Sequence, residues 1–159
     1  MKRSLPERVS EREAAAAAEA AAETAFEKRH RHARAQRSTA LTEDYVELIA
    51  DLMALHGEVR VTEIARRLGV SHPTAVKSVA RLKRDGFVTS RPYRGIFLTE
   101  EGSALADRVR ARHQLVVQLL LAIGVAREDA ESDAEGIEHH VSDRTLAAFE
   151  RYLARSSKR

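Results

Sequence analysis

Residues 61–100 read VTEIARRLGVSHPTAVKSVARLKRDGFVTSRPYRGIFLTE, and this stretch decides the fold. Apolar side chains recur at helical spacing over residues 61–68, where Thr62 is the expected N-cap. A tight turn at Gly69 follows and leads to Ser71, which is the expected N-cap of a second helix. We therefore expect two short helices joined by a glycine turn, the arrangement of a helix-turn-helix.

The second of these helices is expected to bury one side and to end at a glycine. Val76, Val79 and Leu82 supply its buried side, and Gly86 ends it. Short apolar runs on either side of a turn at residues 91–95 then predict a two-stranded hairpin. A helix-turn-helix followed by a hairpin is a winged helix-turn-helix.

Further helices are expected on both sides of this unit. Residues 42–57 have apolar side chains at helical spacing and end in glycine, which predicts a first core helix. Residues 99–124 predict a long helix that the initial threonine caps. Two shorter helices are expected near residues 129–140 and 143–153, with Ser142 as the cap of the second. The fold class is therefore mainly α, with a winged helix-turn-helix followed by an all-helical domain.

These patterns also give the expected domain limits. Residues 1–40 are rich in alanine and poor in larger apolar side chains, so they predict a helical or disordered extension that cannot anchor a core. Residues 41–100 form the expected winged helix-turn-helix, and residues 101–159 the expected helical domain. A contact of the extension with DNA or a partner stays open.

The charge is unevenly distributed along the chain. The net charge is only +3, but residues 60–94 hold nine lysines and arginines against two acidic residues. Residues 41–59 hold five acidic residues and no lysine or arginine. One basic module beside an acidic segment indicates a polyanion as partner, and double-stranded DNA fits a winged helix.

Two absences in the sequence restrict the remaining possibilities. The chain has no cysteine, so disulfides and thiolate metal sites are excluded, and a cytoplasmic location is expected. No apolar run approaches the roughly 18 residues that a membrane span needs, so no membrane association is expected. Any metal must be bound through nitrogen and oxygen.

The expected DNA contacts lie on the second helix of the helix-turn-helix, which enters the major groove in such domains. Hydroxyl groups at its start can bond to bases or phosphates, and a proline there can contact a thymine methyl group. Basic side chains mainly meet phosphates and set affinity. The alternative is a solvated basic face without a nucleic-acid partner. The predicted contacts are Ser71, His72, Pro73, Thr74, Lys77, Ser78, Arg81, Arg91 and Arg94.

Three side chains near the C-terminus have the spacing of a metal site. Glu135, Glu138 and His139 occupy positions i, i+3 and i+4, so a helix presents all three on one face. A surface helix also often carries such residues without a metal. The spacing alone therefore leaves a solvated helix face as an alternative.

A second group of candidate ligands lies earlier in the chain. Asp44 and Glu47 are separated by three residues on the first core helix, and His113 lies midway along the long helix, where it can point between the other two groups. Carboxylates and imidazoles together suit manganese or ferrous iron.

Several stretches resemble the diphtheria toxin repressor family, and its manganese-sensing branch in particular. The resemblance runs in order from residue 41 to 153 without large gaps. Its motifs are TEDYVE at 42–47, YRG at 93–95, LT at 98–99, RH at 112–113 and EGIEHHVS at 135–142.

The resemblance implies a homodimer with an N-terminal winged helix and a C-terminal helical dimerisation region that binds two metal ions per subunit. It implies a repressor that binds a palindromic operator of manganese uptake genes when Mn²⁺ is bound. The ligands implied by matching motif are Asp44, Glu47, His113, Glu135, Glu138 and His139.

Two departures favour Mn²⁺ over Fe²⁺ within this resemblance. The iron-sensing branch has a cysteine and a methionine among its ligands, whereas this chain has Glu135 at the cysteine position. The sequence also stops soon after the expected dimerisation helices, where the iron sensors have an SH3-like domain. A ferrous-iron repressor and a metal-independent winged-helix protein remain as alternatives. A metal-dependent hydrolase is disfavoured, because no nucleophile motif or phosphate-binding glycine loop accompanies the ligands.

Overall fold

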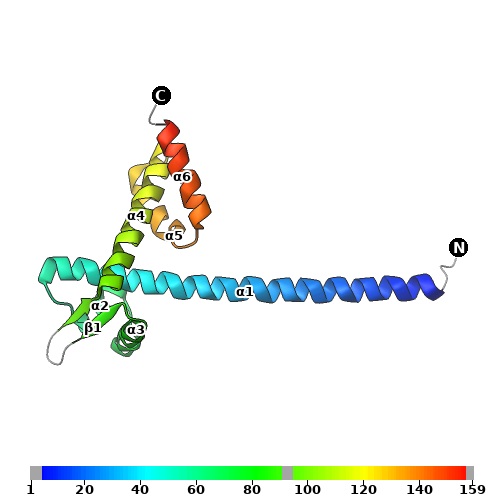
Figure 1. The fold of residues 1–159 in the computed structure, drawn as a ribbon, viewed down its shortest axis with the longest axis horizontal. Coiled ribbons are helices and arrows are strands. Elements are labelled where there is room, and N and C mark those ends of the chain that lie inside the picture. The colour runs from blue at the N-terminus through cyan, green and yellow to red at the C-terminus, as the bar shows by residue number, and fades with distance from the viewer. Residues whose placement is uncertain (1–4, 91–94, 157–159) are drawn as a thin grey trace. The chain divides into compact units, whose positions relative to one another are not determined.

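A computed structural model describes residues 5–90 and 95–156. The chain divides into two compact units, Met1–Ser38 and Thr39–Arg159, and the features below belong to the second. The mainly helical fold with a two-stranded wing is confirmed. The elements are α1 (Leu5–His56), α2 (Val61–Leu68), α3 (His72–Arg84), β1 (Val88–Ser90), β2 (Ile96–Leu98), α4 (Glu100–Ala122), α5 (Arg127–Ile137) and α6 (Asp143–Ser156) (Figure 1).

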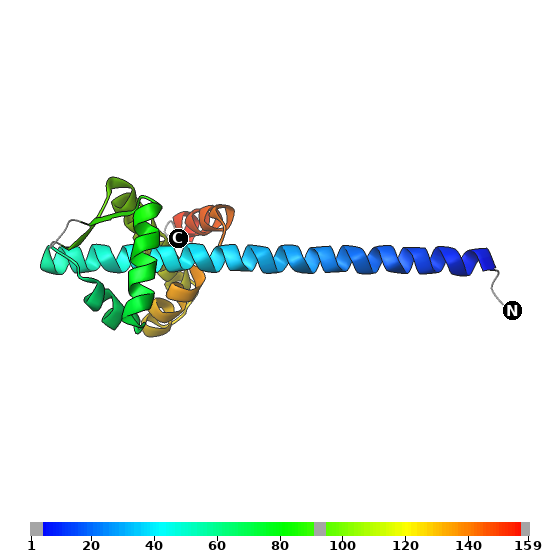
Figure 2. The ribbon, with the colours of Figure 1, turned by 90° about the horizontal axis from the view of Figure 1, so that it is seen from below.

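The helix-turn-helix forms where the sequence predicts it. Gly69 ends α2 in the left-handed conformation, with φ of 64°, which glycine adopts without steric cost. The Ser71 hydroxyl caps α3 by accepting a hydrogen bond from the backbone N–H of Thr74. In the second unit, α3 lies across α1, and Figure 2 shows this crossing.

The wing is a short antiparallel hairpin that is joined to the helical core at both ends. Val88 pairs with Leu98, and Ser90 pairs with Ile96. The Ile96 N–H also donates to the carbonyl oxygen of Val59 at 2.8 Å, so β2 is tied to the segment before α2. These pairings fix the wing beside the helix-turn-helix.

The long helix α4 connects the wing to the C-terminal helices. Thr99 caps it, as predicted, by accepting a hydrogen bond from Gly102 N–H at 3.1 Å. Gly102 lies against the carbonyl oxygen of Phe87, and any Cβ at this position would collide with that oxygen. From there α4 extends to α5 and α6 and packs against both (Figure 1).

Two apolar cores hold the second unit together. The larger core fills the space between α1, the helix-turn-helix, the wing and the start of α4, and Tyr45, Ile49 and Leu82 are among its most buried side chains. The smaller core lies between α4, α5 and α6 and includes Val116 and Leu146. The polar side chains described next come from elements of both cores.

Two expectations about helix ends and caps are wrong. The N-cap of α2 is Arg60, whose extended backbone precedes the helix, and no side chain caps this end. Thr62 therefore lies inside α2. The helix α5 ends at Ile137, before the predicted end near His140, because a tighter turn begins there with a hydrogen bond from His140 N–H to the Ile137 carbonyl oxygen.

Two further differences concern faces and helix starts. Val76 was expected in the core but is 44% exposed, because the buried face of α3 follows the 4 and 3 spacing of Ala75, Val79 and Leu82. The first core helix does not begin at residue 42, since α1 begins at Leu5 and includes it. Within the described residues, no helix is both long and apolar enough to span a membrane.

Candidate metal centre and nucleic-acid interface

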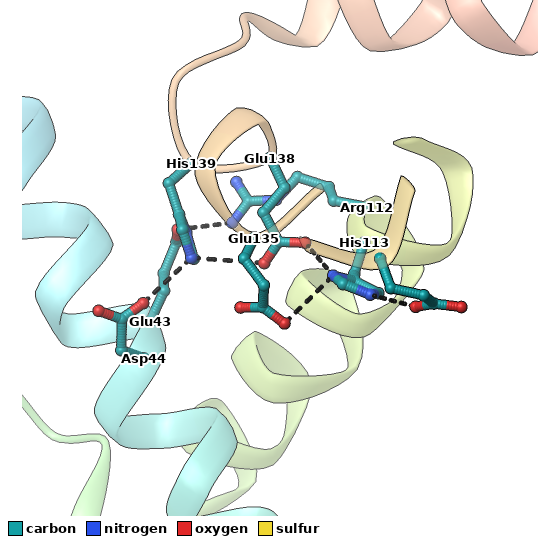
Figure 3. Close-up of polar contacts among 8 residues, drawn as sticks. Glu43, Asp44, Arg112, His113, Glu135, Glu138 and His139 are labelled. Atoms are coloured by element: carbon teal, nitrogen blue, oxygen red, sulfur yellow. Dashed lines mark hydrogen bonds and ion pairs between the residues drawn. The ribbon is translucent and has the colours of Figure 1, made fainter. Parts of the chain in front are cut away.

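Three elements of the second unit bring acidic and imidazole side chains together. Helix α1 contributes Glu43 and Asp44, α4 contributes Arg112 and His113, and the C-terminal end of α5, with the turn that follows it, contributes the rest. Figure 3 shows that these side chains point toward one another from the three elements. The residues from this third element are Glu135 in the last turn of α5, and Glu138 and His139 in the turn directly after the helix.

The first histidine of the cluster faces two carboxylates of α5. His113 Nδ1 lies 2.8 Å from Glu138 Oε2 and 3.7 Å from Glu135 Oε1. One ligand atom from each of the three residues lies within 4.8 Å of the other two. This is the distance range in which three side chains can share one metal ion, so the predicted approach of His113 to the α5 carboxylates is found.

The second histidine faces α1. His139 Nε2 lies 3.0 Å from Asp44 Oδ1 and 3.4 Å from Glu138 Oε1. Glu138 thus stands between the two histidines, with one oxygen toward each. Its side chain is fully buried, and no hydrogen bond reaches Oε1 from any residue that the structure describes. A buried carboxylate oxygen without a donor is costly unless something else compensates it.

Glu47 interacts with the cluster through its charge. Among the described residues, the structure gives no hydrogen bond or ion pair between Glu47 and the cluster. Burial raises the pKa of the Glu47 carboxyl, and the negative charge of Glu135 raises it further. Burial also raises the pKa of Glu138, although the neighbouring histidines oppose the effect. Carboxylates that repel one another in a partly buried place gain most from a nearby cation.

Both histidines favour the protonated form in this setting. The hydrogen bonds of Asp44 and Glu43 raise the pKa of His139 to about 10, against the opposing effect of burial. For His113, burial lowers the pKa, but the carboxylates of Glu131 and Glu138 outweigh it and the net direction is upward. Without a metal ion, imidazolium groups therefore balance part of the carboxylate charge.

Three neighbours of the cluster were missed in the sequence analysis. Glu43 Oε2 accepts a hydrogen bond from His139 Nδ1, and Arg112 pairs with the same oxygen. Glu131 Oε2 lies 3.2 Å from His113 Nε2. For Glu131 a signal existed, because it lies one helical turn before Glu135. Residue spacing held no such signal for Glu43, since its partners lie 69 and 96 residues away in the chain, although Glu43 belongs to the TEDYVE motif.

The predicted DNA-contacting residues of α3 lie largely on its accessible face. His72, Pro73, Thr74 and Lys77 are exposed, as is the N-cap Ser71, and Ser78 at position i+1 from Lys77 is half-buried. The Ser71 hydroxyl already lies 2.8 Å from the Thr74 hydroxyl, so the two act as a pair. Val76 lies on the same accessible face and was missed, because its apolar character indicated burial.

Arg81 and the wing arginines differ from the rest of that set. The Arg81 guanidinium donates to Thr42 Oγ1 at 2.8 Å, so the structure directs it toward α1. This contact links α3 to the segment of α1 that precedes Asp44. Arg91 and Arg94 lie outside the described residues, and their contact with DNA stays a prediction.

Comparisons with protein families match nearly all of the second unit. Residues 38–96 match the family described as iron dependent repressor, N-terminal DNA binding domain. Residues 99–158 match the family described as iron dependent repressor, metal binding and dimerisation domain. The first match contains the helix-turn-helix and wing, and the second contains α4, α5 and α6.

Two curated relatives are similar over most of their length. The transcriptional regulator MntR of Salmonella typhimurium is 51% identical over 119 residues, which cover 75% of this chain and 76% of the relative. The HTH-type transcriptional regulator MntR of Lysinibacillus sphaericus is 42% identical over 104 residues, covering 65% of this chain and 75% of the relative.

Solved structures give the same fold. The manganese-dependent transcriptional repressor in complex with manganese is 30% identical with a TM-score of 0.61, and the match covers 71% of this chain and 52% of that one. The manganese regulator SloR is 27% identical with a TM-score of 0.61, over 71% of this chain and 53% of that one. This chain therefore spans about half the length of those two proteins.

Proposed function

We propose, from the premise that this chain belongs to the iron-dependent repressor family of DNA-binding, metal-responsive regulators, that it is a manganese-responsive repressor. The observation that carries the proposal is Glu138, a buried carboxylate with one oxygen toward each of two histidines and no hydrogen bond to Oε1 among the described residues. Two similar proteins are named for manganese regulation or bind manganese.

The residues present fit a hard divalent cation. The cluster offers carboxylate oxygens and imidazole nitrogens without any thiolate, which is the donor set that suits manganese or ferrous iron. Oε1 of Glu138, which accepts no hydrogen bond from the described residues, is an acceptor that a cation would satisfy. The proposed ligands are Asp44, Glu47, His113, Glu135, Glu138 and His139.

The arrangement suits two ions per subunit. His113 and Glu135 lie on one side of Glu138, and His139 and Asp44 lie on the other. Glu138 is therefore available to both groups through its two oxygens. When bound, a divalent ion supplies positive charge that offsets the repulsion among these carboxylates.

DNA binding is assigned to residues 41–100, and metal binding and dimerisation to residues 101–159. On α3, the hydroxyl of Thr74 can hydrogen-bond to base edges or phosphates, and the positive charge of Lys77 can pair with phosphates. Val76 adds an exposed apolar side chain that suits a thymine methyl group. A palindromic operator follows from the two-fold symmetry of a homodimer.

The ligands connect the two functions because they come from both. Asp44 and Glu47 belong to α1, which packs in the core of the helix-turn-helix, whereas Glu138 and His139 lie in the turn that follows α5. When the carboxylates are not neutralised, their repulsion loosens this junction, and docking on DNA costs more entropy. Binding at the junction therefore favours the arrangement of the two α3 helices that fits the operator.

This function places the protein in the cytoplasm, where its DNA target lies, and it requires binding without catalysis. The named relatives are transcriptional regulators. Ferrous iron is the close alternative, because the matching family models are described as iron dependent. Selectivity for manganese must come from coordination number and geometry, since zinc ordinarily binds such ligands more tightly.

Operator titrations at matched metal concentrations test the proposal. The probe is a labelled duplex from upstream of the manganese transporter gene of the same genome, and fluorescence anisotropy reports binding after EDTA treatment and then with Mn²⁺, Fe²⁺ or Mg²⁺. We expect Mn²⁺ to tighten binding about 5–150-fold, the range of a coupling of about 1–3 kcal/mol. Equal affinity with and without metal would contradict the switch, and a larger effect of Fe²⁺ would favour the iron alternative.

Glu138→Gln tests the ligand assignment. The amide keeps the size of the side chain but removes the charge that stands between the two histidines. We expect the loss of manganese affinity to exceed the roughly 10–100-fold cost of removing a residue that only supports a ligand. Calorimetric titration with MnCl₂ measures this, and circular dichroism checks the fold. Manganese affinity like that of the unmodified protein would refute the assignment.

A further inference from the structure

Glu43 is a buried acidic residue that the proposed ligand set leaves without a role. It lies on α1 directly before Asp44, and it is only 4% exposed. Its Oε2 atom has two partners at short distance, His139 Nδ1 at 2.7 Å and Arg112 Nη2 at 2.6 Å. Burial of a charged side chain is costly unless it is paired, so the presence of a buried glutamate here has to be explained.

The contact between Glu43 and His139 determines which imidazole nitrogen faces the metal cluster. An ionised carboxylate can only accept hydrogen bonds, so Nδ1 of His139 carries a hydrogen that it donates to Glu43. The other nitrogen, Nε2, then faces Asp44 Oδ1 at 3.0 Å and Glu138 Oε1 at 3.4 Å. Figure 3 shows the ring of His139 between these carboxylates.

Arg112 keeps Glu43 in this role. Its side chain is 24% exposed and approaches Glu43 from α4, one residue before His113. The guanidinium lies against Oε2 of Glu43 and so balances the charge of this buried carboxylate. Because Oε2 serves both Arg112 and His139, the two contacts hold the carboxylate in one orientation.

We propose that Glu43, charge-balanced by Arg112, is a positioning residue that orients His139 so that Nε2 faces the metal cluster. This inference rests on the proposed function, because it concerns His139 as a ligand. Metal-binding histidines generally donate their other ring N–H to a carboxylate or carbonyl group, which fixes the ring and increases its basicity. Glu43 occupies that place for His139.

The alternative roles of Glu43 make different predictions. A direct ligand would contribute to metal affinity whether or not His139 is present, and so would a residue that only supports the fold. A positioning residue contributes only through His139. The difference appears in a double-mutant cycle, which measures whether two substitutions act independently.

The cycle compares the full-length protein with the variants Glu43→Ala, His139→Ala and the double variant. Manganese affinity is measured from the electron paramagnetic resonance signal of unbound Mn²⁺ during titration with MnCl₂. We expect Glu43→Ala to weaken manganese binding about 10–100-fold in the otherwise unmodified protein. In the His139→Ala background, Glu43→Ala should change the affinity less than about threefold, since the residue through which it acts is gone.

Two further variants separate positioning from general stability. Glu43→Gln keeps an acceptor oxygen for His139 but loses the charge that pairs with Arg112, so we expect an affinity between those of the unmodified protein and Glu43→Ala. Asp51→Ala removes a different ion pair between α1 and α4, the one that Asp51 forms with Arg110. The described contacts of Asp51 include neither histidine of the cluster. This substitution should leave manganese affinity within about threefold. If Glu43→Ala does not fold, Glu43→Gln takes its place in the cycle.

The outcomes distinguish this inference from the proposed function. An equal loss from Glu43→Ala in both backgrounds, or no loss in either, overturns the positioning role and leaves the metal site intact. If the unmodified protein does not bind Mn²⁺, the proposed function is refuted, and the inference with it. A loss confined to the background that retains His139 supports both.

Discussion

Glu138 directly follows the last residue of α5 and stands between the two histidines of the cluster. Its N–H still donates to the Ala134 carbonyl oxygen at 2.9 Å, so the helical path continues to Glu138 although α5 ends at Ile137. Residues at i, i+3 and i+4 therefore still share one face where the helix ends. Residue spacing does not indicate the partners of Glu43, because they come from distant segments and only the tertiary structure brings them together.

Glu131 also contacts a histidine of the cluster, but it is exposed whereas Glu43 is buried, so its substitution should have a smaller effect. It lies 3.2 Å from His113 Nε2 and 3.3 Å from Arg127, but its side chain is 49% exposed. Exposed pairs contribute about 0–1 kcal/mol, so Glu131→Gln should weaken manganese binding less than about fivefold. Calorimetric titration with MnCl₂ measures the change. A loss as large as that expected for Glu43→Ala would show that solvent does not screen this carboxylate.

At the scale of whole elements, apolar spacing predicted which helices form better than where they begin and end. The caps at Ser71, Thr99 and Ser142 were found because a hydroxyl at a helix start has a definite local function. Val76, Val79 and Leu82 are all apolar and lie three residues apart, so all three were expected on the buried side of α3. The sequence does not show which of them faces the neighbouring elements. That choice is made by the surrounding elements.

Gly102 makes the junction of the wing and α4 testable. A methyl group here would collide with the Phe87 carbonyl oxygen, so Gly102→Ala should destabilise the protein by about 1–3 kcal/mol. Gly136→Ala is the matched control, because no atom lies within 4 Å of a Cβ there and alanine favours a helix by about 0.5–1 kcal/mol. Urea unfolding of both variants measures the difference. Similar stability of the two would contradict the close approach.

The contact of Arg81 with Thr42 links α3 to α1 near the metal cluster. Thr42→Val removes the acceptor of a hydrogen bond from a charged group while leaving every residue of α3 unchanged. Because a hydrogen bond to a charged group contributes about 1.5–3 kcal/mol, we expect the gain in operator affinity on adding Mn²⁺ to shrink, at most by a factor of about 12 to 150. Anisotropy titrations with and without Mn²⁺ measure it. An unchanged gain would exclude this contact from the coupling.

In the whole molecule, the basic residues and the candidate metal ligands lie in different segments, and we expect them to have different roles. We expect the basic segment over residues 60–94 to supply an affinity for DNA that does not depend on metal and that falls with salt. We propose that the carboxylates and histidines at the junction of α1, α4 and α5 supply the dependence on metal. Residue spacing and the family resemblance predicted that these ligands meet, but the position of Glu138 between the two histidines was visible only in the fold.

The central claim is that manganese and operator DNA stabilise the same arrangement of this protein. Thermodynamic linkage then requires that each raises the affinity for the other by the same factor. The most direct test is calorimetric titration of the protein with MnCl₂, once alone and once saturated with operator duplex at constant salt. We predict tighter manganese binding in the presence of DNA, by the factor found in the operator titrations. Manganese affinity that is the same with and without DNA would contradict the claim.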